Sequence, residues 1–223
     1  GLGDVYKRQP QGLAMGPGGI IYSSEHGQSN DDEVNIIQPG RNYGWPNVQG
    51  MCNTSSENSF CAANNVVEPI DTFSPCAAVN GLTWYNHPAI PEWQNCLLLS
   101  VMGGFALDDK RLSVLSMSED GMTVTGETQW FASNGQRIRD VAVNPTTGAV
   151  YLAFNGPSYP GSGPNIIKEF RNLDYVPVTN VAGCQYPGAL NYNANATQDD
   201  NSCQFAGCTD PEALNYVPWA NVT

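Results

Sequence analysis

The chain has 223 residues, 13% of them charged, and its acidic residues outnumber its basic residues by 21 to 9. The formal net charge of -12 excludes a protein built to bind nucleic-acid phosphates, because that surface needs clustered Lys and Arg. No stretch reaches the roughly 20 apolar residues of a membrane-spanning helix, so we expect no membrane span and a sizeable core in one large or two small domains.

Residues 1–9, GLGDVYKRQ, read like a translated sequencing adapter. We expect them to be a non-native leader. Residue 1 is not Met, so the lack of a signal peptide here says nothing about secretion.

Residues 10–172 alternate short runs of β-branched and aromatic residues with Gly, Pro and Asn turns, and no segment of 12 or more residues has a helical apolar period. This pattern predicts an all-β region, either a sandwich or a propeller. A propeller blade takes roughly 40–50 residues, so the region would supply about three or four blades. Strands are expected at 18–25, 32–38, 81–86, 95–101, 111–118, 125–132, 138–145, 148–155 and 165–171.

The seven cysteines include no CxxC pair, which makes a zinc or thiol-redox site a weak interpretation. Their spacing instead favours disulfides in an oxidising compartment. The predicted pairs are Cys52–Cys61, Cys76–Cys96 and Cys184–Cys203, which leaves Cys208 over.

After a predicted linker at 173–182, residues 183–206 are followed by a second copy of the same pattern at 207–223, with a period of about 24. The second copy stops before its second cysteine, which explains the odd Cys208. These copies resemble the GCTDPxAxNYNPxAxxDDGSC repeats near the C-termini of secreted bacterial proteins, so cell-surface association through the repeats is possible. Asp199 and Asp200 either hold Ca²⁺ or belong to a solvated, disulfide-stapled spacer.

Three phrases occur in one order: PQGLAMGPGGIIYSSEHGQSNDDEVNIIQPGRNYGWP (10–46), GLTWYNHPAIPEWQNCLLLS (81–100) and GQRIRDVAVNPTTGAVYLAF (135–154). Together they resemble the soluble glucose/sorbosone dehydrogenase family, whose members are six-bladed β-propellers that use pyrroloquinoline quinone (PQQ) and Ca²⁺. The resemblance covers roughly the C-terminal half of that domain. It implies a partial propeller followed by the small disulfide-stapled tail.

The resemblance also assigns the acidic stretch that begins at Glu25. Backbone carbonyls at Gly27 and Gln28 would hold the Ca²⁺ that contacts the quinone, while the acid of Glu33 and the carbonyl of Tyr43 would bind a second, structural calcium. Mixed carbonyl and carboxylate ligands suit this cation. The neighbouring acids at 31 and 32 either share this role or cap a solvated turn.

Arg137 and Arg139 lie two apart in an expected strand, so both side chains should point to one face. The resemblance places both at the quinone, whose three carboxylates suit planar guanidinium groups. The alternative is a surface pair, either Arg139 with Asp140 or Arg137 with a glutamate. Arg8 falls where the family has the arginine that assists hydride transfer. Its neighbour Gln9 replaces the family's Asn.

Two departures from the family pattern concern the cofactor. Ser100 to Gly104 contains no lysine where the family usually has one that contacts the quinone, and Asn155 replaces a common acid. The general base of the family is a histidine in an earlier blade, and neither His26 nor His87 matches it. His26 lies beside the expected calcium loop and could approach the site, whereas His87 precedes Pro88 in a turn.

The sequence therefore predicts part of a secreted or periplasmic quinoprotein that oxidises a sugar or related alcohol and passes electrons to an unknown acceptor. The alternative is a non-catalytic propeller that binds carbohydrate or a protein partner at the cell surface.

Overall fold

The computed structural model describes residues 9–104, 109–132, 135–158, 163–176 and 181–222. The chain divides into two compact units, residues 1–173 and 174–223, and each is treated separately below. All regular strands and the α-helix of the described residues belong to the first unit.

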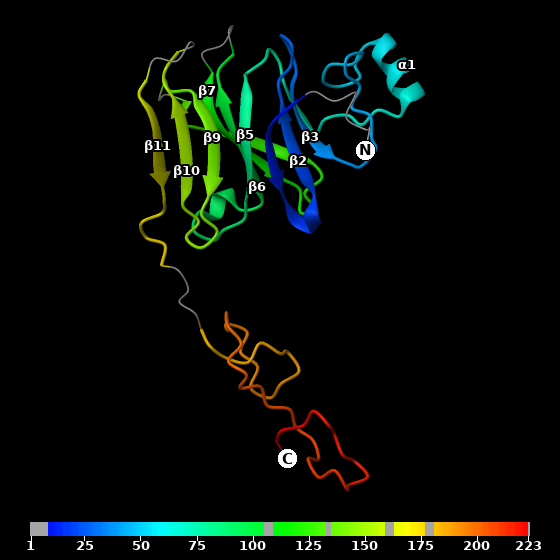
Figure 1. Cartoon of the computed structure of the whole chain (residues 1–223), viewed down its shortest axis with the longest axis vertical. Coiled ribbons are helices and arrows are strands. Elements are labelled where there is room, and N and C mark those ends of the chain that lie inside the picture. The colour runs from blue at the N-terminus through cyan, green and yellow to red at the C-terminus, as the bar shows by residue number, and fades with distance from the viewer. Residues whose placement is uncertain (1–8, 105–108, 133–134, 159–162, 177–180, 223) are drawn as a thin grey trace. The chain divides into compact units, whose positions relative to one another are not determined.

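The first unit is built from three antiparallel sheets, drawn in Figure 1 from blue to yellow. The first sheet contains β1 (Pro10–Met15), β2 (Ile21–Glu25), β3 (Asp32–Ile37) and β4 (Asp71–Phe73). The second contains β5 (Val79–Tyr85), β6 (Cys96–Met102), β7 (Lys110–Met117) and β8 (Val124–Trp130). The third contains β9 (Ile138–Val143), β10 (Val150–Asn155) and β11 (Asn165–Phe170).

Each sheet is a meander in which consecutive strands pair, as in the blade of a propeller. The first strands of the three sheets are neighbours, with β1 in contact with β5 and β5 in contact with β9. The all-β prediction is confirmed, and the described part of the chain supplies three blades.

The core lies between the blades and not within them. One apolar cluster joins the first and second blades through side chains such as Tyr22, Val34 and Leu97. A second cluster joins the second and third blades through residues that include Leu98 and Leu152. Fully burying an aliphatic side chain stabilises the folded state by about 1.5–3 kcal/mol, so the blades hold one another in place.

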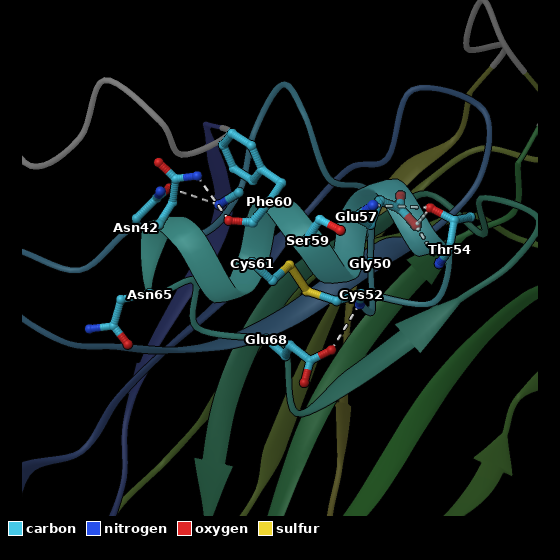
Figure 2. The surroundings of a disulfide bond; sticks show 12 residues. Asn42, Gly50, Cys52, Thr54, Glu57, Ser59, Phe60, Cys61, Asn65 and Glu68 are labelled. Atoms are coloured by element: carbon cyan, nitrogen blue, oxygen red, sulfur yellow. Dashed lines mark hydrogen bonds between the residues drawn. A yellow bond between two sulfur atoms is a disulfide. The ribbon is translucent and has the colours of Figure 1, made fainter.

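The α-helix α1 (Ser55–Asn64) lies in the excursion between β3 and β4 and has no buried residue. Its sequence lacks an apolar period, which is why the sequence did not predict it. Thr54 and Glu57 form a capping box at its start, and a disulfide joins Cys52 to Cys61 (Figure 2). This helix buries no apolar face, so the capping box and the disulfide stabilise it instead.

Two of the three predicted disulfides are present, Cys52–Cys61 and Cys184–Cys203, but the prediction of Cys76–Cys96 is wrong. Cys76 precedes the start of β5, where Val79 pairs with Val101, whereas Cys96 pairs with Tyr85 at the other end of the same hairpin. About six residues of strand, roughly 20 Å, separate the two ends. A disulfide needs Cα atoms within about 7 Å.

The second unit repeats one backbone pattern. The backbone of Cys184 forms an isolated β-bridge with that of Tyr192, and Cys208 forms the equivalent β-bridge with Tyr216. Asn193 N–H donates to the Cys184 carbonyl and Val217 N–H donates to the Cys208 carbonyl, both at 2.9 Å. Each copy thus folds into the same small loop, and only the first carries a disulfide.

Among the described residues, no helix has the length and apolar character to cross a membrane.

Candidate active site on the inner strands

The first strands of the three blades, β1, β5 and β9, are called the inner strands below. A pocket of about 340 Å³ opens where they meet. Its wall contains Gln11, Gly12 and Leu13 of β1, Asn80, Gly81 and Leu82 of β5, and Arg139 and Asp140 of β9. One strand of every blade therefore contributes to it, and its volume lies at the lower end of the range for small-molecule sites.

A register shift interrupts each inner strand at the pocket. In β1 the shift lies between Pro10 and Gly12, and in β5 it lies between Val79 and Leu82. In the third blade Ala153 pairs with Asp140 and Phe154 pairs with Ile138, so Arg139 is the extra residue. Such bulges re-aim side chains. Three successive bulges thus turn polar groups toward one space.

Glycine makes the close approach of these strands possible. A Cβ on Gly12 would lie 2.6 Å from the Asn80 carbonyl oxygen, and one on Gly81 would overlap the Asp140 carboxylate. Glycine inside a strand is a signal for a bulge or for close backbone contact. This signal could have located the pocket from the sequence.

The two arginines reach one shared partner, as expected, although the bulge at Arg139 interrupts the regular alternation of the strand. Nη2 of Arg137 and Nη1 of Arg139 both donate to the Met102 sulfur at 3.5 Å. Arg137 is 8% exposed and also donates to the Ser158 carbonyl at 3.2 Å, whereas Arg139 is exposed at the pocket. Of the two guanidinium groups, that of Arg137 is therefore buried and that of Arg139 lies in the pocket wall.

The loop at Gly27 is fixed by one buried carboxylate. Asp32 is fully buried, and its two oxygens accept hydrogen bonds from Gly27 N–H at 2.6 Å and from Val79 N–H at 3.2 Å. The sequence left two roles open for this acid, calcium binding or capping of a solvated turn. Asp32 caps the turn at Gly27, but it is buried and not solvated. It ties the Gly27 loop to the start of the inner strand β5.

Short contacts connect the Gly27 loop to the arginines. A Cβ on Gly27 would lie 2.6 Å from Sγ of Cys76, and one on Gly104 would overlap the Cys76 carbonyl. Met102, the sulfur partner of both arginines, donates its N–H to the Ala78 carbonyl at 3.0 Å. The segment 76–80 therefore lies between the expected calcium loop and the expected quinone ligands.

Glu33 is 6% exposed and accepts from Gly50 N–H at 2.9 Å and from Asn35 Nδ2 at 3.0 Å. The Tyr43 phenol donates to the Ile36 carbonyl at 2.9 Å and accepts from Gln38 N–H at 2.7 Å. Burial raises the pKa of this phenol, and the nearby Glu25 raises it further against the opposing hydrogen bond. Arg8, the predicted catalytic arginine, lies outside the described residues.

The two histidines differ in their surroundings. Nε2 of His26 lies 3.4 Å from Nδ2 of Asn80, in the pocket wall. Nδ1 of His87 accepts from Ala89 N–H at 3.1 Å in the turn that follows β5, and His87 does not line the pocket. Sequence reasoning did not single out Asn80 or Met102 as site residues, and it considered Asp140 only as a surface partner of Arg139.

In the described part of the chain, no group of three or more His, Cys, Asp or Glu side chains could hold a metal ion. Three of the expected ligands, Gly27, Gln28 and Tyr43, would act through backbone carbonyls and would not form such a group.

Three meander blades whose inner strands enclose a polar pocket define part of a β-propeller. Residues 5–159 match the Glucose / Sorbosone dehydrogenase family, and the chain belongs to this family.

The chain is 36% identical over 143 residues to aldose sugar dehydrogenase YliI of Escherichia coli, a match that covers 62% of this chain and 37% of that protein. It also resembles the apo structure of the soluble aldose sugar dehydrogenase from E. coli, with a TM-score of 0.55 and 29% identity over 73% of this chain and 45% of that one. The PQQ-bound aldose sugar dehydrogenase of Streptomyces coelicolor, with a TM-score of 0.56 and 23% identity over 74% and 43% of the two chains, shares the fold. The chain thus spans less than half the length of these relatives.

Proposed function

We propose that this chain is part of a PQQ- and calcium-dependent dehydrogenase that oxidises a sugar or a related alcohol outside the cytoplasm. One observation carries the proposal: Arg137 and Arg139 converge beside the pocket of the inner strands, and contacts through residues 76–80 connect them to the loop at Gly27. Relatives named as sugar dehydrogenases add support.

The pair of guanidinium groups fits a ligand that carries several carboxylates. Arg139 borders the pocket, and Arg137 is held behind it by the Ser158 carbonyl and the Met102 sulfur. A thioether is a weak acceptor, so Nη1 of Arg139 can exchange the Met102 sulfur for a stronger acceptor. Planar guanidinium groups bind carboxylates through paired, charge-assisted hydrogen bonds.

The Gly27 loop fits a cation bound by carbonyl oxygens. Packing against Asn30 and Cys76 leaves no space for a side chain at position 27, and the buried Asp32 fixes the adjacent backbone. In this role the carbonyls of Gly27 and Gln28 would hold the cation, and the surrounding strands would limit the access of water. Bound PQQ supplies the chemistry, because it accepts a hydride equivalent from the alcohol carbon of the substrate.

The loop that follows β6 distinguishes this chain from the family pattern. Met102, Gly103 and Gly104 provide no cation where a lysine is usual. A hydrogen bond to a charged group contributes about 1.5–3 kcal/mol, so we expect weaker quinone binding than in lysine-containing relatives. The arginines then carry most of the recognition.

Binding of PQQ to the chain in the presence of Ca²⁺ tests the proposal, by titration of the quinone absorbance or of protein fluorescence. Replacement of Arg139 by Leu should weaken binding roughly 10- to 100-fold, as loss of a charge-assisted contact predicts. Arg171→Leu is the matched control, since Arg171 is exposed and its nearest acid is 3.9 Å away. Equal affinities of the two variants would contradict the assignment.

The second step is an assay of dye reduction with a panel of aldoses and the contiguous full-length protein loaded with PQQ and Ca²⁺. Turnover of one class of sugar supports the dehydrogenase. PQQ binding without turnover of any sugar would favour the non-catalytic binding propeller, for which the missing loop lysine is the supporting observation.

A further inference from the structure

The two copies of the repeat in the second unit have the same loop in different surroundings (Figure 1, orange to red). Residues that lie 24 positions apart are equivalent. Tyr192 N–H donates to the Ala189 carbonyl at 3.3 Å, and the equivalent Tyr216 N–H donates to the Ala213 carbonyl at 3.1 Å. The loop that precedes each of these tyrosines is therefore folded in both copies.

In the first copy, this loop binds the extended segment at the end of the copy. Leu190 N–H donates to the Gln204 carbonyl at 2.7 Å, and Gln204 N–H donates to the Asn191 amide oxygen at 2.8 Å. Nδ2 of Asn191 also donates to the Ser202 carbonyl at 2.7 Å. Three hydrogen bonds from two neighbouring residues thus hold the segment 202–204.

The bound segment also covers the cysteine of the copy. Cys184 forms its disulfide with Cys203 of this segment and is 1% exposed, and Ala189 of the loop is 9% exposed. In the second copy, the equivalent Cys208 and Ala213 are half-buried, and Cys208 is a free thiol. Because the two loops share one backbone pattern, the bound segment accounts for this difference in exposure.

The second copy keeps the groups that bind the segment in the first. Its loop has Leu214 and Asn215 at the positions of Leu190 and Asn191. The Leu214 side chain is fully exposed, and Asn215 is exposed. In the part of the chain that the structure describes, the Leu214 N–H and the Asn215 amide make no hydrogen bond. The donors and the acceptor of the loop are therefore present and open.

The segment in the first copy is shared with the copy that follows. Ser202 and Gln204 bond to the first copy, whereas their neighbours Cys203 and Phe205 bond to the second. Nδ2 of Asn221 donates to the Cys203 carbonyl at 2.6 Å, and Phe205 N–H donates to the Asn221 amide oxygen at 2.7 Å. An extended segment directs successive backbone groups to opposite sides. One such segment therefore joins two copies.

We propose that Leu214 and Asn215, with the thiol of Cys208, form a docking site for an extended segment of the pattern DDNSCQ, which residues 199–204 have, supplied by a further copy of this repeat. The backbone of the segment binds as a strand added to the loop. The site lies in the second unit, and the inference does not rest on the proposed dehydrogenase function.

The covalent step is a thiol–disulfide exchange with a segment whose cysteine arrives as a mixed disulfide. The Cys208 thiol loses its proton to solvent, and the thiolate attacks the sulfur of the segment. The bond between that sulfur and its former partner breaks, and the partner leaves as a thiolate. The hydrogen bonds at Leu214 and Asn215 hold the segment in place for this attack.

The synthetic peptide DDNSCQ, with its cysteine joined to thionitrobenzoate, is the probe. It ends before the residue equivalent to Phe205, because Phe205 packs on the Tyr186 ring, with centres 5.9 Å apart, where the second copy has Asp210. Peptide mass spectrometry after timed reaction measures the rate at each thiol. Cys208 should react at least tenfold faster with this peptide than with the scrambled peptide QDCNDS. Cys76 of the first unit should react equally with both.

Asn215→Ala removes the amide that holds the segment and should reduce the preference of Cys208 for DDNSCQ to within twofold. Asn195→Ala changes another exposed asparagine of the second unit and should keep the tenfold preference. Equal rates of the ordered and scrambled peptides at Cys208 of the parent overturn the inference. A preference that survives Asn215→Ala also overturns it.

Hydrogen exchange of the purified adduct, measured by NMR, gives a second readout. Docking should slow the exchange of the Leu214 N–H at least tenfold, toward the rate of the Leu190 N–H, because a peptide carbonyl accepts its hydrogen bond. If the peptide is attached to Cys208 while the exchange of Leu214 is unchanged, the disulfide is adventitious and the docking site is rejected.

Discussion

Individual side chains fix the contact between the first two blades. Arg111 of β7 is 3% exposed and contacts Asp109, Glu127 at 3.2 Å, and the Phe73 ring at 5.8 Å from its centre. Phe73 belongs to β4, so the arginine joins the outermost strand of the first blade to the second blade. Nothing in the sequence around Arg111 marks it as buried, because its partners come from three different segments.

Replacement of Arg111 by Met should lower the free energy of unfolding by about 3 kcal/mol, since removal of one partner leaves buried charge without compensation. The partly exposed acids place the expected cost at the lower end of the range. Urea unfolding measures it. Arg171→Met removes an exposed pair and should cost less than about 1 kcal/mol; equal costs would show that Arg111 is not a link between blades.

Asp71 of β4 gives the same contact a pH dependence. Burial raises the pKa of its carboxyl and nearby Glu127 raises it further, while the hydrogen bond from Thr72 N–H lowers it. The folded-state pKa therefore lies above the ordinary value of 3.8. The contribution of this pKa difference to the free energy of unfolding is therefore complete below pH 3.8, where the Asp71 carboxyl is protonated. It disappears as the pH rises through the folded-state pKa.

Asp71→Asn keeps the acceptor for Thr72 and removes the charge. The variant should be more stable than the parent at pH 7 and equal to it near pH 3, as measured by thermal unfolding across this range. A variant less stable than the parent at pH 7 would show that the Asp71 charge stabilises the fold.

At the scale of elements, every strand predicted from the sequence is present, because alternation and turn residues are local signals. β1 and the short β4 were not predicted. β1 begins with Pro10 and contains Gly12, two weak strand formers, and it exists because it pairs with β2 and packs on β5. The helix α1 was also missed, since caps and a disulfide hold it.

The site was only partly predictable for a related reason. The common side of Arg137 and Arg139 was expected from their spacing. The calcium role of the motif around Glu33 stays a prediction. The bulges that form the pocket depend on how each inner strand pairs with its neighbour. A one-residue register shift leaves no trace in composition, apart from glycines such as Gly81.

The thiols provide a test of the elements that carry them. Burial raises the pKa of the Cys96 thiol, which opposes thiolate formation, whereas Cys76 and Cys208 are only half-buried. Iodoacetamide should therefore modify Cys76 and Cys208 in the native protein at least tenfold faster than Cys96. Peptide mass spectrometry after timed labelling measures these rates. Rapid labelling of Cys96 in the folded state would show that β6 is not buried between the blades.

At the scale of the molecule, the chain contains two units. The first consists of three propeller blades, and the second consists of Cys-containing repeats. The blades depend on one another, because both apolar clusters lie between sheets. The pocket has the same dependence, since one strand of each blade forms its wall. The pocket and the stability of the fold therefore depend on the same contacts among β1, β5 and β9.

A crystal structure of the chain grown with PQQ and Ca²⁺ would test the proposed quinone and calcium site on the inner strands most directly. We expect quinone density whose carboxylates lie within hydrogen-bond distance of Arg137 and Arg139. A cation should lie between the quinone and the backbone carbonyls of residues 27 and 28. Density for the quinone away from the inner strands, or an empty pocket at saturating cofactor, would contradict it.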